Sequence, residues 1–225
     1  MKLNRLSLCA GLGLLLCQFG FARTYTNTAG RTIEATFVSA TETEVTLKLK
    51  RTGKSYTLPI ASLSAKDIDF IAQKRAEQFK LEELDINRQA SKRALLKLVD
   101  FAEANRGKKV GNGECWTLVN NAYNETGISR PGADQRVWGR LVDWKNEEIQ
   151  PGDVLELRAA TFSNGMKTGP AHTALVIKGG KRKGQMTVLH QNWGGGNKTV
   201  AEADFDLSLM TVGEAMIYRY EITAD

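Results

Sequence analysis

The sequence is poor in the residues that stabilise small disulfide-rich and zinc-binding proteins. It has three cysteines, two histidines and four prolines in 225 residues. Two of the cysteines, Cys9 and Cys17, lie in an apolar N-terminal segment. The remainder of the chain has one thiol, Cys115, so it cannot form an intramolecular disulfide. The wide spacing of cysteine and histidine also excludes a zinc finger, whose ligands come in close pairs.

Long apolar runs are confined to the N-terminus. Lys2 and Arg5 precede an apolar stretch at residues 6–16, and small residues lead to a cut after Ala22. This order is typical of a secretory signal. We therefore interpret residues 1–22 as a bacterial signal peptide and expect a secreted or periplasmic protein.

A lipoprotein signal is the alternative interpretation of this segment. It would place the acylated residue at Cys17, but that signal normally has a small residue before the cysteine, and here Leu16 precedes it. No later segment approaches the ~20 apolar residues that a membrane span needs. We expect no transmembrane segment after signal cleavage.

The chain has only a mild excess of positive charge. Its formal net charge is +6, and removing Lys2 and Arg5 lowers this to +4. Two basic clusters, at residues 48–54 and 178–183, coincide with expected hairpin turns, where lysine and arginine are usually solvated. We therefore expect no nucleic-acid partner.

Residues 23–75 have the pattern of a small β domain. Residues 32–38 and 44–50 alternate apolar and polar side chains, and 55–58 form the return strand of a hairpin. Ser64 then precedes a helical pattern as its N-cap, with Asp67 three residues later. The pattern predicts a small SH3-like barrel that ends in a helix.

The same segment resembles the SLA-one homology domain, a small SH3-like barrel found in a fungal endocytic adaptor and in secreted bacterial proteins. The resemblance implies a protein-binding role for residues 23–75, without fixing the ligand. It rests on residues 23–26, Gly30-Arg31, 34–38, 45–47, 56–59, and Leu63-Ser64 with Asp67.

A charged helical segment separates this domain from the rest. Apolar residues recur at helical spacing from Ile86 to Ala102, which predicts two helices or one long broken helix. We interpret residues 76–104 as a helical linker.

Residues 105–225 mix one helix with several strands. The helix is expected at residues 116–125, and strands at 154–157, 173–177, 185–192 and 212–222. This order predicts an α+β domain in which the helix that follows Cys115 packs on an antiparallel sheet.

Cys115 lies where a glycine-rich loop meets this helix. Gly111 and Gly113 let the backbone approach closely, and a helix N-terminus favours a thiolate through its partial positive charge. Its unpaired N–H groups can also face an oxyanion. The alternative is a buried, inert cysteine, since free cysteine is among the most buried residue types.

Both histidines follow on expected strands. His172 begins a buried strand, where an imidazole can accept a proton from a thiol. His190 ends the next strand and can orient the first imidazole. Zinc bound by Cys115 and the two imidazoles is a further possibility, although no fourth ligand stands out.

The order of cysteine, histidine and a further polar residue resembles papain-like domains of the NlpC and CHAP types. It is most similar to the C-terminal cysteine-proteinase-fold domain of fungal Bbc-type adaptors, which work in protein assembly. The resemblance rests on residues 107–118, Trp138-Gly139, residues 150–154 and 171–174, Gln191-Asn192 and residues 217–219.

The resemblance implies roles for particular residues. Cys115 would be the nucleophile, His172 the base and His190 the orienting residue, with Asn192 as an accessory group. Apart from the resemblance, we expect Glu114, Trp116 and Trp193 to contact substrate, although tryptophans more often pack in a core. NlpC-type domains have Asp before the cysteine and Ser after it, whereas this chain has Glu114 and Trp116, and a carboxylate facing the sulfur would disfavour a thiolate.

Two functions therefore stay open at this point. The first is a cysteine peptidase or amidase acting on peptide or peptidoglycan amides. The second is a non-catalytic module that binds protein or glycan through a degenerate papain-like domain. Neither requires a cofactor, and none is expected; the sequence leaves the oligomeric state open.

Overall fold

The computed structural model describes residues 21–130, 136–193 and 196–222. The chain divides into two compact units, Met1–Leu81 and Glu82–Asp225. Most of the proposed signal peptide, with Cys9 and Cys17, lies outside the described residues. Within them, no helix has the length and apolar character needed to cross a membrane.

The first unit contains one antiparallel sheet in the order β1-β2-β3-β4. A short helix, η1 (Ile60–Ser62), follows it. Among the described strands β1 does not pair with β4, so the sheet is open and a closed barrel is not shown. The strands are β1 (Arg23–Thr26), β2 (Thr32–Ala40), β3 (Glu44–Leu49) and β4 (Ser55–Pro59).

A buried carboxylate joins this sheet to the start of α1 (Ala65–Ala104). Asp67 accepts hydrogen bonds from Arg23 at 2.7 Å and from the Thr26 backbone N–H at 2.8 Å. The Asp67 N–H donates to the hydroxyl of Ser64 at 3.4 Å, as an N-cap requires. The helix is continuous over 40 residues and includes the whole predicted linker at 76–104.

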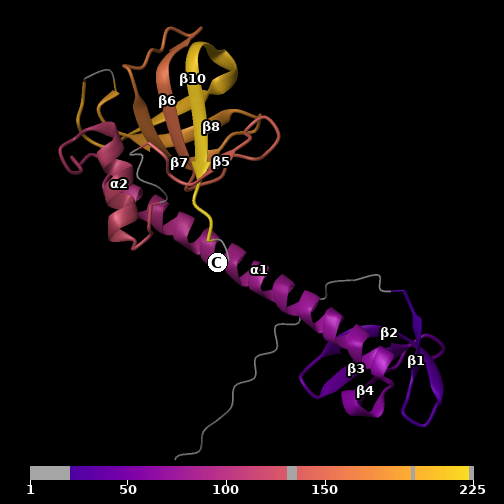
Figure 1. Cartoon of the computed structure of the whole chain (residues 1–225). Coiled ribbons are helices and arrows are strands. Elements are labelled where there is room, and N and C mark those ends of the chain that lie inside the picture. The colour runs from indigo at the N-terminus through magenta and orange to yellow at the C-terminus, as the bar shows by residue number, and fades with distance from the viewer. Residues whose placement is uncertain (1–20, 131–135, 194–195, 223–225) are drawn as a thin grey trace, which may run out of the picture. The chain divides into compact units, whose positions relative to one another are not determined.

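The second unit contains a six-stranded antiparallel sheet in the order β5-β10-β6-β7-β8-β9. The helix α2 (Cys115–Glu125) lies beside this sheet (Figure 1). The strands and one short helix are β5 (Arg140–Val142), β6 (Val154–Phe162), β7 (His172–Gly179), β8 (Gln185–His190), β9 (Ala201–Asp206), η3 (Leu207–Leu209) and β10 (Met210–Arg219). The predicted α+β arrangement is confirmed, whereas β5 and β9 were not predicted.

Alternate residues of the central strands enter two separate hydrophobic clusters. Val154 and Leu175 pack with α2 and the last turns of α1 in the first cluster. Leu155 and Ala174, one position away, belong to the second cluster on the other face. This alternation explains the near-continuous apolar run of β7, because both faces of the strand are buried.

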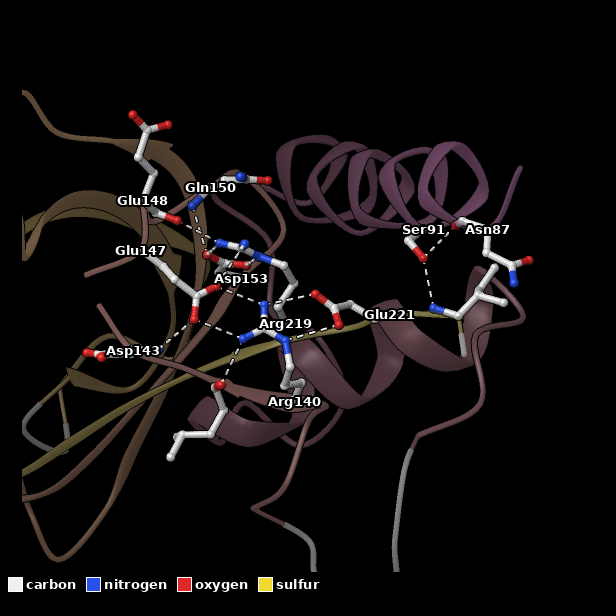
Figure 2. A network of polar contacts seen from close by, with 12 residues as sticks. Asn87, Ser91, Arg140, Asp143, Glu147, Glu148, Gln150, Asp153, Arg219 and Glu221 are labelled. Carbon is white, nitrogen blue, oxygen red and sulfur yellow. Dashed lines mark hydrogen bonds and ion pairs between the residues drawn. The ribbon is translucent and has the colours of Figure 1, made fainter. Parts of the chain in front are cut away.

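A buried ion pair joins the end of β10 to the turn before β6 (Figure 2). The guanidinium of Arg219 donates to both carboxylate oxygens of Asp153, at 2.7 and 2.8 Å. It also donates to the backbone carbonyl of Glu148 at 2.7 Å. Asp153 has no exposed surface, and this burial raises the pKa of its carboxyl group. Loss of either partner would leave an unpaired buried charge.

We predict that Gly152→Ala strongly destabilises the second unit. Gly152 has φ +92°, and a Cβ there would lie 2.6 Å from Leu95 Cβ. Backbone strain and the clash together should cost about 3 kcal/mol of unfolding free energy. Urea unfolding of this variant and of the unchanged chain would measure the loss of unfolding free energy.

Gly165→Ala is the matched control for this substitution. Gly165 has a similar φ of +90°, but nothing lies within 4 Å of the position of its Cβ. Only the strain of about 1 kcal/mol should remain. If both variants lose the same unfolding free energy, the close contact between Gly152 and α1 is not the reason why residue 152 must be glycine.

Candidate functional site

Cys115 is the first residue of α2 and is partly exposed. Glu114 occupies the N-cap position in an extended conformation, but its side chain does not cap the helix. Among the described residues, no hydrogen bond uses the backbone N–H of Cys115 or Trp116. These two donors at the positive end of the helix dipole remain available to an anion.

The side chain of Gln191 holds the loop before Cys115 against the end of β8. Its Nε2 donates to the carbonyls of Val110 and Glu114, at 2.9 and 2.8 Å, and to the hydroxyl of Thr117 at 3.0 Å. Its Oε1 accepts from the Val110 N–H at 3.2 Å. Gln191 has no exposed surface. Sequence reasoning did not assign it a role, since a glutamine at a strand end is usually solvated.

The carboxylate of Glu114 is held between two side chains from the following loop. It accepts from Asn192 Nδ2 at 2.7 Å and from Lys198 Nζ at 3.0 Å. The bond from Lys198, helped by the one from Asn192, lowers the pKa of Glu114. The carboxylate is therefore an anion that already has two partners. The substrate contact assigned to Glu114 stays a prediction.

Asn192 lies just outside β8 in a left-handed conformation, with φ +59°. Its amide nitrogen bonds to Glu114, while its Oδ1 is buried and has no hydrogen-bond partner among the described residues. A left-handed asparagine at a strand end turns the chain sharply. The residue thus joins the loop around Cys115, but its accessory role in catalysis stays a prediction.

The two histidines lie against each other and against Trp193. The ring centroids of His172 and His190 are 5.1 Å apart, and those of His172 and Trp193 are 4.7 Å apart. The indole of Trp193 also contacts Phe205 of the second hydrophobic cluster, at 5.2 Å. Both imidazoles are therefore buried in mainly apolar surroundings, 3% exposed for His172 and 6% for His190.

Burial keeps both imidazoles neutral. It lowers the pKa of His172 from 6.5 to about 3, with a smaller contribution from the nearby His190. Burial also lowers the pKa of His190. Within the described part of the chain, His172 Nε2 and His190 Nδ1 have no hydrogen-bond partner. An unpartnered buried nitrogen is costly unless it serves a ligand or a reaction.

A second buried carboxylate fixes the start of β7. Glu156 Oε1 accepts from Trp138 Nε1 and from the Thr173 hydroxyl, both at 2.7 Å. Burial raises the pKa of Glu156. Thr173 is the neighbour of His172, so these bonds help to hold that imidazole in place. The sequence gives no signal for this role, because the partners of Glu156 lie far from it in the sequence.

The structure brings the loop of Cys115 to the residues that directly follow His190. Among the described residues, no hydrogen bond joins the Cys115 sulfur to either imidazole, and no group of three or more acidic, cysteine or histidine side chains is arranged to hold a metal. Trp116 packs against the first hydrophobic cluster and Trp193 against the imidazoles. The catalytic and substrate-contact roles of these residues stay predictions.

The comparison with protein families decides the identity of the second unit. Residues 88–221 match the family described as the AIM3/BBC1 cysteine proteinase-fold domain. The chain belongs to this family. The resemblance of residues 105–225 to the Bbc-type domain is thereby confirmed, and the AIM3/BBC1 match also includes the last turns of α1.

One solved structure is similar to this AIM3/BBC1-family chain, the NlpC1 protein from Trichomonas vaginalis. The two share 20% sequence identity with a TM-score of 0.38, over 91% of this chain and 68% of the other. None of the curated proteins matches the chain.

We predict that Gln191→Leu destabilises the AIM3/BBC1-family unit by about 3 kcal/mol. It would leave the buried N–H of Val110 without its partner, which costs roughly 1–3 kcal/mol, and would remove the bonds from Gln191 Nε2 to Glu114 and Thr117. The matched control is Gln185→Leu, whose amide bonds to Asp206 near the surface. Urea unfolding of both variants would measure the difference in unfolding free energy. Equal losses would contradict the conclusion that the buried amide of Gln191 holds the loop before Cys115.

The neutral imidazoles should make the protein sensitive to mild acid. The unfolded chain binds a proton at each histidine as the pH falls below 6.5, while the folded chain does not. The contribution of the neutral imidazoles to the free energy of unfolding is therefore complete above pH 6.5 and is lost as the pH falls. For His172 the loss is roughly 2 kcal/mol between pH 7 and pH 5, and His190 contributes in the same direction.

His172→Leu should flatten this acid dependence of the unfolding free energy. Urea unfolding at pH 5, 6 and 7 would detect the change. The chain has no third histidine, so a double variant with His190→Leu should lose the whole histidine contribution to this slope and keep only that of carboxyl groups such as Asp153 and Glu156. An unchanged slope in the double variant would contradict the burial of neutral imidazoles.

Proposed function

We propose that the second unit is a cysteine peptidase or amidase that hydrolyses peptide or peptidoglycan-type amide bonds at Cys115. One observation carries the proposal: the loop of Cys115 is hydrogen-bonded through Gln191 and Asn192 to the end of the strand that carries His190. His172 lies beside His190. These contacts support a site in which Cys115 and the two imidazoles act together.

In this proposal His172 acts as a neutral general base. Its imidazole takes the thiol proton as the Cys115 sulfur attacks the amide carbon, and the carbonyl oxygen becomes an oxyanion. The uncapped N–H groups of Cys115 and Trp116 are donors suited to this charge. The protonated His172 then gives its proton to the leaving amine, and water hydrolyses the thioester that remains.

The residues around the site have distinct supporting roles in the proposal. His190 packs edge-to-face on the ring of His172 and limits its orientation. Trp116, next to Cys115 in the sequence, and Trp193, which packs on His172, would offer aromatic surface to a substrate. The carboxylate of Glu114 is held by Asn192 and Lys198. The ammonium of Lys198 balances its negative charge, so Glu114 has no need of a proton from the Cys115 thiol.

A non-catalytic binding module is the second candidate, and two observations favour it. No hydrogen bond among the described residues joins the Cys115 sulfur to His172, and burial holds the pKa of His172 at about 3, which makes it a weak base. In that case the papain-like unit would bind protein or glycan, and Cys115 would be an unused thiol.

We also propose that the protein is exported and that its first unit is an SH3-like SLA-one homology domain that binds protein. The signal-like residues 1–22 support export. The four-stranded antiparallel sheet followed by a helix supports the domain assignment. Its binding partner would bring the second unit to its substrate.

Hydrolysis by the purified chain would test the catalytic proposal. Peptidoglycan and a mixed peptide library are incubated with the protein, and new amine and carboxyl ends are detected by mass spectrometry. We expect products from the unchanged chain, none from Cys115→Ala, and at least a hundredfold loss of rate for His172→Leu. Equal product from Cys115→Ala would exclude a thiol mechanism, and retention of intact fragments without cleavage would favour the binding module.

A further inference from the structure

The loop at residues 105–117 carries an excess of positive charge. It contains three basic residues and one acidic residue, Glu114. Arg106 pairs with carboxylates of α1 and β9, and the ammonium of Lys108 donates to a backbone carbonyl of α1. Among the described residues, the ammonium of Lys109 has no hydrogen bond or ion pair. Its charge is therefore available to a bound molecule.

Two lysine side chains pack on the backbone of Gly113, two residues before Cys115. A Cβ at Gly113 would lie 2.9 Å from Lys198 Cβ and 3.1 Å from Lys109 Cε. Gly113 also has φ +87°, so the conformation and the close contact both favour glycine there. Because Cε carries the ammonium group, the charge of Lys109 lies close to this backbone.

The two ammonium groups differ in their partners. Lys198 Nζ donates to Glu114 Oε1 at 3.0 Å, so the charges of this pair offset each other. Lys109 has no such partner within the described part of the chain. The backbone N–H groups of Cys115 and Trp116 have no acceptor among the described residues and add the positive end of the α2 dipole near the thiol. Two independent sources of positive potential therefore lie near Cys115.

We infer that the site at Cys115 selects substrates that carry a carboxylate next to the scissile amide, and that Lys109 binds this carboxylate. The inference rests on the proposed hydrolase function and names its substrate class. A carboxylate at that position gains the attraction of the Lys109 ammonium, whereas an uncharged or basic side chain does not. Lys198 has a different role, because its ammonium offsets the charge of Glu114, which would otherwise repel the same carboxylate.

Two alkylating agents test the charge at the site without relying on hydrolysis. The Cys115 thiolate reacts with both iodoacetate and iodoacetamide, but only iodoacetate is an anion. The ratio of the two labelling rates, followed by mass spectrometry of the Cys115 peptide at neutral pH, therefore reports the potential at the sulfur. We expect Lys109→Met to lower this ratio about threefold, and Lys198→Met about tenfold because it also leaves Glu114 unpaired. High salt should weaken both effects.

Lys181→Met is the matched control for the loss of one lysine. It removes an exposed ammonium from the turn between β7 and β8, at the other end of β8 from His190. The ratio of labelling rates should stay the same in this variant. A Cys115 that neither agent labels, or a ratio that Lys109→Met does not lower, overturns the inference.

A mixed peptide library tests the substrate class directly. Asp and Glu should be enriched next to the bond that the unchanged chain cuts, and Lys109→Met should lose this enrichment. Cut sites without acidic neighbours overturn the substrate class. If the labelling ratios shift as expected and no peptide is cut, the hydrolase proposal fails while the preference of the site for anions stands.

Discussion

The candidate site depends on one buried amide. Gln191 makes four hydrogen bonds to residues 110–117, and these bonds fix the loop that carries Cys115 against the end of β8. A buried amide that is fully bonded orders its neighbours, while a partly bonded one is costly. An apolar residue in place of Gln191 would remove this polar link between the N-terminus of α2 and the strand that carries His190.

Other buried polar groups hold neighbouring strands of the same sheet. Glu156 fixes Thr173, the neighbour of His172, and the Asp153–Arg219 pair joins β10 to the turn before β6. Each of these side chains is almost wholly buried. Since buried polar groups must be satisfied, the packing of the second unit allows few alternative positions for β7 and β8. The imidazoles are held by their surroundings, and among the described residues no hydrogen bond joins either of them to Cys115.

Much of the fold could be predicted from the pattern of apolar residues. The start of α2 is one residue from its expected position, and the apolar runs at residues 173–177 and 185–192 do form neighbouring strands. The strand β9 (Ala201–Asp206) was not predicted, because only Phe205 is buried and its sequence therefore lacks an apolar alternation. The closed barrel expected for residues 23–75 is not shown, since alternation predicts strands but not how a sheet closes.

The details of the site were less predictable. Strand alternation was expected to continue to Asn192, but β8 ends at His190 and Asn192 adopts φ +59°. The partners of Gln191 and Glu156 depend on contacts between residues far apart in sequence. The neutral state of His172 depends on burial by Trp193 and His190, which no local pattern reveals.

The central claim is that Cys115 and His172 act together, and the pH dependence of thiol alkylation tests it most directly. Iodoacetamide labelling of Cys115 is followed by mass spectrometry from pH 4 to pH 8 in the unchanged chain and in His172→Leu. If His172 takes the thiol proton, labelling declines less toward acid in the unchanged chain than in the variant, where the thiol has no base. Identical profiles for the two proteins would contradict the account.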